Sequence, residues 1–462
     1  MVLSIFIGCS DADYEELNRD PNNPTQVSAD QLFVSATKSL FDQMESTNVN
    51  INVFRLFSQY WTETTYTDEE NYDLNNRRIP DNHWSEIYRD ILFDIKDAKS
   101  IVEAEEGTTS PKIGQLTVLE VYAWQILVDT FGDIPFTEAL QGKEIKSPVY
   151  DNDTDVYNAL ATMIDSAIST LNSGQGFESS DLIYGGDLSA WSKFANSLKL
   201  KLGARLSEVN PTLAGTMMSE AVSGGVFTSN NDNATLAYEG TTPNTNPIWI
   251  ALVQSGRNDF VAANTLVDHM NSLDDPRRSV YFKENLGADT YVGGTYGASA
   301  TFSAYTHVGE MLHDPTFRGV LMDYAEVEFS LAEAVELGIV SGSAESHYNA
   351  GVTASFNNWG VSDVATYLTN PDVAYTTASG TWKEKIGMQY WLAMYNRGFE
   401  GWYVYRKFDA PTFNVAATSG LPVPKRYTYP IAEQSINEAN WSAASSAIGG
   451  DEQQTSVFWD VN

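Results

Sequence analysis

The stretch Ile113–Gly132, IGQLTVLEVYAWQILVDTFG, carries apolar residues almost all the way round a helix. A helix that is apolar on every face is buried within a protein. Pro111 suits the first turn of this helix, and Gly132 suits the turn that ends it. The sequence therefore predicts a central buried helix against which the rest of the chain packs.

The segment before this helix predicts an amphipathic neighbour over residues 81–106. Ile87, Ile91 and Ile95 lie four residues apart, which puts them on one helical face. Asp81 is a suitable cap for the start, and Gly107 is suitable for the end.

More helices are expected along the rest of the chain. Asp153 opens one with apolar residues at three-and-four spacing, and Pro211 stops another. The expected ranges are 153–171, 188–209, 324–337, 344–358 and 383–399. Helices of this length joined by short turns predict a mainly α fold, in which tetratricopeptide-like helix pairs form a scaffold.

Two regions, 224–316 and 406–462, have a different composition. They are rich in Gly, Asn, Thr and aromatic residues, and within the first only Phe260–Leu273 has a helical pattern. Their aromatic content argues against disorder. We expect long irregular loops with minor β structure, and one α-helical domain over residues 10–462.

The chain is strongly acidic, with a formal net charge of -34. Such a surface repels phosphate backbones and anionic headgroups, so nucleic acid is excluded as a partner. The acids also serve solubility. Uncharged polar ligands such as sugars or peptides need no basic groove and remain candidates.

The usual signatures of catalysis are missing from the sequence. The five histidines have no H-E-x-x-H spacing, and there is no G-x-S-x-G elbow, phosphate loop or dinucleotide fingerprint. We therefore expect no enzyme activity, no catalytic residue, no metal and no cofactor. A glycoside hydrolase needs only two carboxylates, so a mainly helical glycosidase is the alternative.

Aromatic residues beside amides, acids and arginines are the main candidates for a binding site. A sugar ring presents C–H groups to an aromatic face and hydroxyls to polar side chains. Most single rings in a protein belong to its core, so the clusters carry more weight than their members. The predicted ligand-binding residues are Trp61, Tyr66, Tyr72, Asn75, Arg77, Trp84, Trp249, Arg257, Asp259, Tyr296 and Tyr305.

The single cysteine, Cys9, follows a short apolar run, IFIG, and precedes several acids. This arrangement resembles a bacterial lipobox, with residues 1–9 as the remnant of a lipoprotein signal and Cys9 as the lipidated residue. The acids after it resemble the stretch that routes lipoproteins to the outer face of the outer membrane. The alternative is an ordinary terminus with an unmodified cysteine.

Several stretches resemble landmarks of the SusD/RagB family, in particular its SusD-like subgroup. They are LNRDPNNPT (17–25), DTFGDIPFTEAL (129–140), LDDPR (273–277), EFSLAEAVELG (328–338), YWLAMYNRGFEGWYVYRKFDAP (390–411) and VPKRYTYPIAEQSINEANW in the tail. The resemblance implies a lipid-anchored outer-membrane protein at the cell surface. It also implies capture of oligosaccharides or peptides for a SusC-like TonB-dependent transporter.

Three hypotheses follow from the sequence. The first is a surface lipoprotein that binds a nutrient and hands it to the transporter, with Trp61, Tyr72, Trp84 and Trp249 as the aromatic platform. The second is the helical glycosidase. The third is a structural scaffold that associates with the transporter and binds no small ligand.

Overall fold

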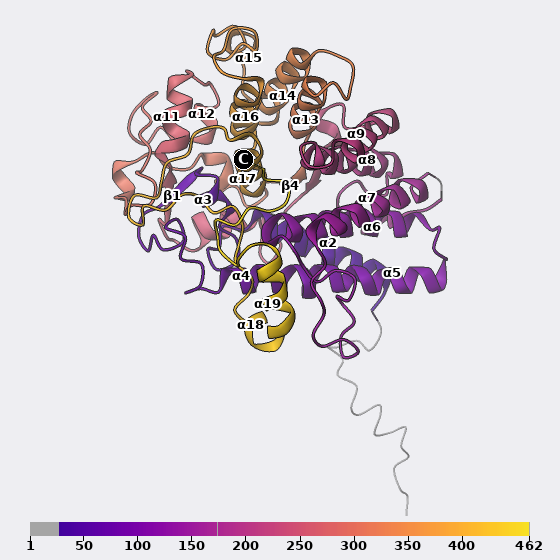
Figure 1. Cartoon of the computed structure of the whole chain (residues 1–462). Coiled ribbons are helices and arrows are strands. Elements are labelled where there is room, and N and C mark those ends of the chain that lie inside the picture. Colours follow the sequence, from indigo (N-terminus) through magenta and orange to yellow (C-terminus); the bar gives the residue numbers. More distant parts are fainter. Residues whose placement is uncertain (1–26, 173, 462) are drawn as a thin grey trace, which may run out of the picture.

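The computed structural model describes residues 27–172 and 174–461, and its architecture is shown in Figure 1. The predicted signal remnant at residues 1–9, with Cys9, lies outside the described residues. The helices are α2 (Ala29–Glu45), α3 (Phe54–Phe57), α4 (Ile79–Ser85), α5 (Phe93–Glu105), α6 (Pro111–Phe131), α7 (Asp153–Thr170), α8 (Leu188–Leu206), α9 (Pro211–Gly224), α10 (Pro247–Trp249), α11 (Asn264–Ser272), α12 (Arg278–Tyr281), α13 (Tyr324–Glu336), α14 (Ala344–Asn358), α15 (Val364–Tyr367), α16 (Trp382–Ala393), α17 (Gly398–Phe408), α18 (Glu433–Ile436) and α19 (Glu438–Ala447).

The strands are few and short. They are β1 (Trp61–Glu63), β2 (Ala234–Leu236), β3 (Phe260–Ala262) and β4 (Gly319–Met322). β1 pairs with β3, and β2 pairs with β4, both antiparallel. The fold is mainly α with minor β structure, as predicted.

Helix α6 is the predicted central helix. Every residue of it except Lys112 and Glu120 is buried. Its first turn is capped by the Ser110 hydroxyl, which accepts from the Lys112 N–H. Gly132 follows with a φ of 79°, in the left-handed region that glycine enters without steric cost.

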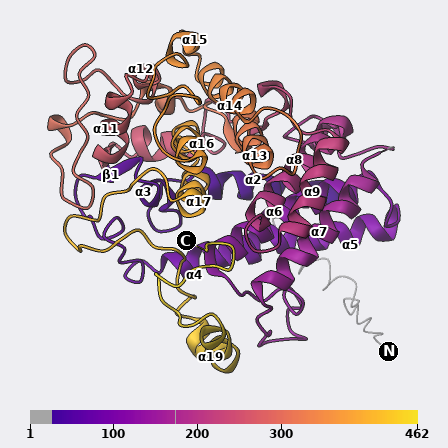
Figure 2. The same ribbon diagram turned by 45° about the horizontal axis from the view of Figure 1, so that its top comes forward.

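The helices pack as neighbouring pairs, α6 on α7, α8 on α9, α13 on α14 and α16 on α17. Figures 1 and 2 show these pairs following one another across the molecule. The close approach of α13 and α14 depends on Gly351, where a Cβ atom would lie 2.9 Å from the Phe329 ring. The predicted helix pairs are thus confirmed.

The helix predicted over residues 81–106 needs correction. The helical segment begins at Ile79, and a π-helical stretch, Glu86–Leu92, separates α4 from α5. Asp81 caps no helix here, because its carboxylate accepts from the backbone N–H groups of Ile431 and Ala432 at 3.0 and 3.1 Å. The acid ties the C-terminal tail to α4.

The helix predicted over residues 383–399 is two helices. Asn396 has a φ of 74°, which breaks the helical path between α16 and α17. Gly398 then lies so close to α3 that a Cβ atom on it would be 2.4 Å from the backbone nitrogen of Arg55. The helix predicted over residues 188–209 is also shorter than expected. It ends at Leu206, so Pro211 does not stop it and instead opens α9.

The two loop-rich regions contain more regular structure than predicted. Phe260–Ala262 is a strand, and only the residues after it form α11. The tail carries α18 and α19, which project from the bottom of the molecule in Figure 1. No helix of the described residues is long and apolar enough to cross a membrane.

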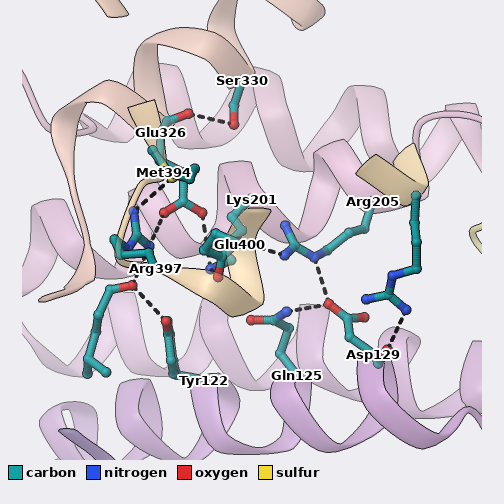
Figure 3. Close-up of polar contacts among 12 residues, drawn as sticks. Tyr122, Gln125, Asp129, Lys201, Arg205, Glu326, Ser330, Met394, Arg397 and Glu400 are labelled. Atoms are coloured by element: carbon teal, nitrogen blue, oxygen red, sulfur yellow. Dashed lines mark hydrogen bonds and ion pairs between the residues drawn. The ribbon is translucent and has the colours of Figure 1, made fainter. Parts of the chain in front are cut away.

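A central ion-pair network joins the helices inside the core (Figure 3). Lys201 and Arg205 of α8 both pair with Glu400 of α17, and the distance from Arg205 to Glu400 is 3.1 Å. Arg205 also reaches Asp129 of α6 at 2.8 Å, and Lys201 reaches Glu326 of α13 at 3.1 Å. Arg397 pairs with Glu326 at 2.6 Å and with Asp323 at 3.3 Å. The network consists of Asp129, Lys201, Arg205, Asp323, Glu326, Arg397 and Glu400, all of them buried.

Candidate functional site

A pocket of about 400 Å³ opens beside the paired strands β1 and β3. We call it the Tyr66 pocket. It is lined by the loop 46–50, residues 63, 65, 66 and 77, and parts of the segment 247–260. Its volume lies in the ordinary range of small-ligand sites.

The strand pairing creates the pocket by joining two segments far apart in the sequence. Glu63 lies opposite Phe260 in the ladder. Beyond the ladder, the Thr64 N–H donates to the Asp259 carbonyl at 2.8 Å, and the Thr64 hydroxyl donates to the Asn258 carbonyl at 2.6 Å. Tyr66, which follows β1, and Arg257, which precedes β3, therefore line a common space.

The third wall is the loop that follows α2. The buried Arg55 guanidinium donates to the Ser46 carbonyl at 2.8 Å, which fixes the start of this loop. The Asn48 side chain accepts from the Asn50 backbone N–H at 3.1 Å. The Asn50 carboxamide also donates to Asn48 Oδ1 at 2.7 Å, so two carboxamides are held at the pocket without a ligand, which lowers the entropy cost of binding.

Tyr66 is the most exposed aromatic residue at the pocket, with 69% of its surface accessible. Its φ of 58° is uncommon for a non-glycine residue, and such strain concentrates at functional sites. Ile250 of the adjoining π-helical turn, Ile250–Gln254, is also exposed. The pocket thus offers an aromatic ring and an aliphatic surface to a ligand.

Charged groups complete the pocket. Arg257 pairs with Asp259 at 2.7 Å, and this hydrogen bond raises the pKa of the guanidinium. Tyr66 and Arg257 both line the pocket. Arg77 pairs with the buried Glu69. Both guanidiniums are oriented by carboxylates and retain donors for a ligand.

Three buried acids, Glu63, Glu69 and Glu70, form a carboxylate cluster at the pocket, and of these Glu63 belongs to the lining. Glu70 accepts from the Thr62 hydroxyl at 2.6 Å and from the Glu63 N–H at 2.8 Å. Burial, with the nearby charges of Glu69 and Glu70, raises the pKa of Glu63 to about 10. Burial raises the pKa of Glu70 to about 8. The cluster is therefore partly protonated at neutral pH.

The pKa of Glu63 predicts a stability that falls as pH rises. Below its ordinary value of 4.5 the group is protonated in both the folded and the unfolded chain, and its contribution is complete. As pH rises toward 10, the unfolded chain loses this proton first, so folding becomes less favourable. Glu63→Gln removes the titration. The free energy of unfolding of Glu63→Gln, relative to that of wild type, is expected to increase by more than about 1.4 kcal/mol between pH 5 and pH 9.

Thermal unfolding of both proteins at the two pH values measures this change. Asp68→Asn, an exposed acid in the same loop, is the matched control. A difference between Glu63→Gln and wild type that stays constant with pH would contradict the prediction.

The structure brings Tyr66, Arg77, Arg257 and Asp259 together, as four of the eleven predicted site residues. Trp61, Tyr72 and Tyr296 are buried, with at most 4% of their surface accessible. The Trp61 indole donates to the Tyr395 hydroxyl at 3.2 Å, and the Tyr72 ring packs edge-on against Phe57. This corrects the expectation that Trp61 and Tyr72 belong to an aromatic platform and that Tyr296 contacts a ligand, since all three side chains are buried in the core.

The other four predicted residues lie away from the lining of the pocket. Trp84 is half-buried and packs on Tyr88 and Phe131. Asn75 is exposed, whereas Trp249 and Tyr305 are half-buried. Trp249 lies in α10 between Pro247 and Ile250, which do line the pocket.

Sequence reasoning missed the loop 46–50 and the carboxylate cluster. The triplet Asn48-Val49-Asn50 after an amphipathic helix was a usable signal, because asparagines favour ordered turns. Nothing distinguished Glu63, Glu69 and Glu70 from the other acids of so acidic a chain. Among the described residues, no group of three or more His, Cys, Asp or Glu is arranged to hold a metal ion.

Comparison with known proteins gives a consistent set of similarities. Residues 21–430 match the SusD-like family, described as "Starch-binding associating with outer membrane". No curated protein matches the sequence.

Solved structures resemble the chain over most of its length. A chitin-binding SusD homologue from Flavobacterium johnsoniae is 25% identical, with a TM-score of 0.79 over 94% of this chain and 97% of that one. A protein described as chitin-binding is 25% identical, with a TM-score of 0.81 over 94% and 100%. A SusD-like protein from Bacteroides thetaiotaomicron is 26% identical, with a TM-score of 0.79 over 94% and 99%.

Proposed function

Because the chain belongs to the SusD-like family of starch-binding proteins that associate with the outer membrane, we propose that it captures oligosaccharides at the bacterial cell surface. It then delivers them to a SusC-like TonB-dependent transporter. Membership of a family of binding proteins identifies the chain as a binding protein and not an enzyme. Lipidation of Cys9 would anchor it to the membrane, and two or more acyl chains make such anchoring stable.

The observation that carries this proposal is the pairing of the exposed Tyr66 ring with fixed polar groups in one pocket. An aromatic face suits the C–H groups of a sugar, and Arg257, Asp259 and the carboxamides of the loop 46–50 suit its hydroxyls. Two relatives described as chitin-binding support glycans over peptides as the first ligands to test.

The glycosidase alternative finds no support in this pocket. Glu63 lines the pocket, but it interacts with Glu69 and Glu70, and Asp259 is paired with Arg257. A glycosidase needs two carboxyl groups on opposite sides of the scissile bond. The acids here are instead used to orient guanidiniums and hydrogen-bond the backbone.

Substitutions at the pocket are expected to weaken glycan binding without unfolding the chain. Tyr66→Ala removes an exposed stacking surface, and a loss of about 10-fold in affinity is expected. Arg257→Ala removes donors to the ligand and leaves Asp259 unpaired, for a loss of about 10- to 100-fold. Isothermal titration calorimetry with maltohexaose and N-acetylchitohexaose measures both.

Arg318→Ala is the matched control, because Arg318 is an exposed arginine that donates to Thr235 outside the pocket. Its affinity should equal that of the wild type. Unchanged affinity of both pocket variants for an oligosaccharide that the wild type binds would refute the pocket as the site.

A further inference from the structure

A second concave surface lies on the helical side of the molecule, with a volume of about 550 Å³. It forms where the short 3₁₀ turn Asn230–Asp232 meets α13 and α14. Figures 1 and 2 both show α14 apart from β1, which carries Glu63 of the Tyr66 pocket. We call this surface the asparagine groove. Its main lining residues are Asn230, Asn231, Tyr324, Asn349, Thr353 and Asn357.

Every residue that lines the groove is uncharged, although the chain has a net charge of -34. The lining thus offers neither a cation to an anionic ligand nor a carboxylate to a cationic one. Carboxamides and hydroxyls both donate and accept hydrogen bonds. A neutral ligand rich in hydroxyl groups matches this set of partners.

Helix α14 supplies the length of the groove. Asn349, Thr353 and Asn357 follow one another at intervals of four residues, so they form a stripe that rises by roughly 6 Å at each step. The small residues Ala350 and Ala354 lie next to this stripe and also line the groove. The result is a shallow floor with a polar group at each helical turn.

The walls of the groove are held in place before any ligand binds. The Asn230 side chain donates from Nδ2 to the Ala354 carbonyl at 2.9 Å, which fixes the 3₁₀ turn against α14. Asn233 accepts from the Tyr324 N–H at 2.7 Å, which fixes the same turn against α13. A preorganised surface loses less entropy when it binds.

Asn230 also leaves one acceptor unused. Its Oδ1 atom is buried and has no hydrogen-bond partner within the described residues. A buried acceptor without a partner is unfavourable, so a ligand hydroxyl that reaches Oδ1 would form a hydrogen bond that the free protein lacks. The Thr353 hydroxyl donates to the Asn349 carbonyl at 2.7 Å and keeps its accepting capacity.

We propose that the asparagine groove is a second binding site, for a neutral oligosaccharide, separate from the Tyr66 pocket. This inference rests on the proposed function in taking glycans as the ligand class. Two sites on one chain hold one polysaccharide more tightly than either site alone, because the second contact is intramolecular. The groove thus contributes to the retention of a long glycan, whereas the pocket binds a short segment.

Calorimetric titration with N-acetylchitohexaose and maltohexaose tests the groove. The wild type is expected to bind two molecules of at least one of these probes. Asn349→Ala combined with Asn357→Ala should remove one of the two sites, and Tyr66→Ala should weaken the other. The matched control is Asn158→Ala with Thr162→Ala on α7, an exposed pair with the same internal Thr-to-Asn-carbonyl bond, here 3.2 Å long.

The outcomes separate the two proposals. One bound oligosaccharide, unaffected by the groove variant and weakened by Tyr66→Ala, overturns the groove and leaves the proposed function intact. Binding that is lost only in the groove variant supports the groove and refutes the pocket. No binding of either probe overturns both. The double variant is expected to fold, because Asn357 is exposed and Asn349 is only half-buried, and circular dichroism checks this.

Discussion

Replacing Glu400 with alanine is expected to lower the free energy of unfolding by about 3–5 kcal/mol. Glu400 is buried between Lys201 and Arg205, which it pairs with on adjacent turns of α8. Burial alone would raise the pKa of Glu400, but the charges of Lys201, Arg205 and Arg397 outweigh it and lower the pKa to about 2. The carboxylate is therefore charged, and removing it leaves two cations short of a partner.

The remaining acids of the central ion-pair network do not replace it. Glu326 stays with Lys201 at 3.1 Å, and Asp129 stays with Arg205 at 2.8 Å. Asp129 is already shared, since it also accepts from the Tyr157 hydroxyl and the Trp459 indole. Breaking a buried pair on one side costs more than the pair contributes, because the desolvated charge is left behind.

Urea unfolding of Glu400→Ala and wild type measures the loss. Glu103→Ala, an exposed glutamate on α5, is the control and should change stability by less than about 0.5 kcal/mol. A Glu400→Ala variant within about 1 kcal/mol of wild type would show that the network is neutral for stability.

Trp402→Ala is expected to cost a similar amount, about 3–5 kcal/mol. Trp402 of α17 is fully buried, and its indole donates to the Pro424 carbonyl at 2.7 Å. The Arg406 guanidinium lies 3.4 Å from the centre of the Trp402 ring and 4.7 Å from that of Trp459. Truncation leaves a cavity beside this stack and frees the carbonyl that fastens the tail.

Trp402→Phe separates the two causes, because it fills most of the volume but lacks the N–H donor. It should lose about 1–3 kcal/mol, the cost of an unpaired buried acceptor. The midpoints of urea unfolding give both values. Equal stability of Trp402→Ala and Trp402→Phe would mean that packing contributes nothing at this position.

The parts of the fold that local sequence decides were predictable. Ile113–Gly132 is apolar on every face and α6 is buried on every face, and α14 runs from Ala344 to Asn358 as its pattern predicts. The break between α16 and α17 was not predictable. It depends on Asn396 in the left-handed region and on Gly398 against Arg55, a contact between segments hundreds of residues apart.

Contacts between distant segments also decide which aromatic residues are exposed at the Tyr66 pocket. Tyr66 and Trp61 are five residues apart in one aromatic cluster, yet one is exposed and the other is buried. What separates them is the pairing of β1 with β3, which covers Trp61 and ends before Tyr66. Composition pointed to the segment that contains Tyr66 and Arg77 of the pocket, but only long-range pairing decides which ring faces remain available.

That pairing has a consequence for detecting an unknown ligand. β1 and β3 are joined by three residue pairs, and the Thr64 N–H extends the junction by bonding to Asp259. A molecule that touches both Tyr66 and Arg257 bridges the two segments, so their separation requires that it dissociate first. Hydrogen–deuterium exchange at the Thr64 amide therefore slows in proportion to occupancy, which makes this amide a reporter for screening glycans.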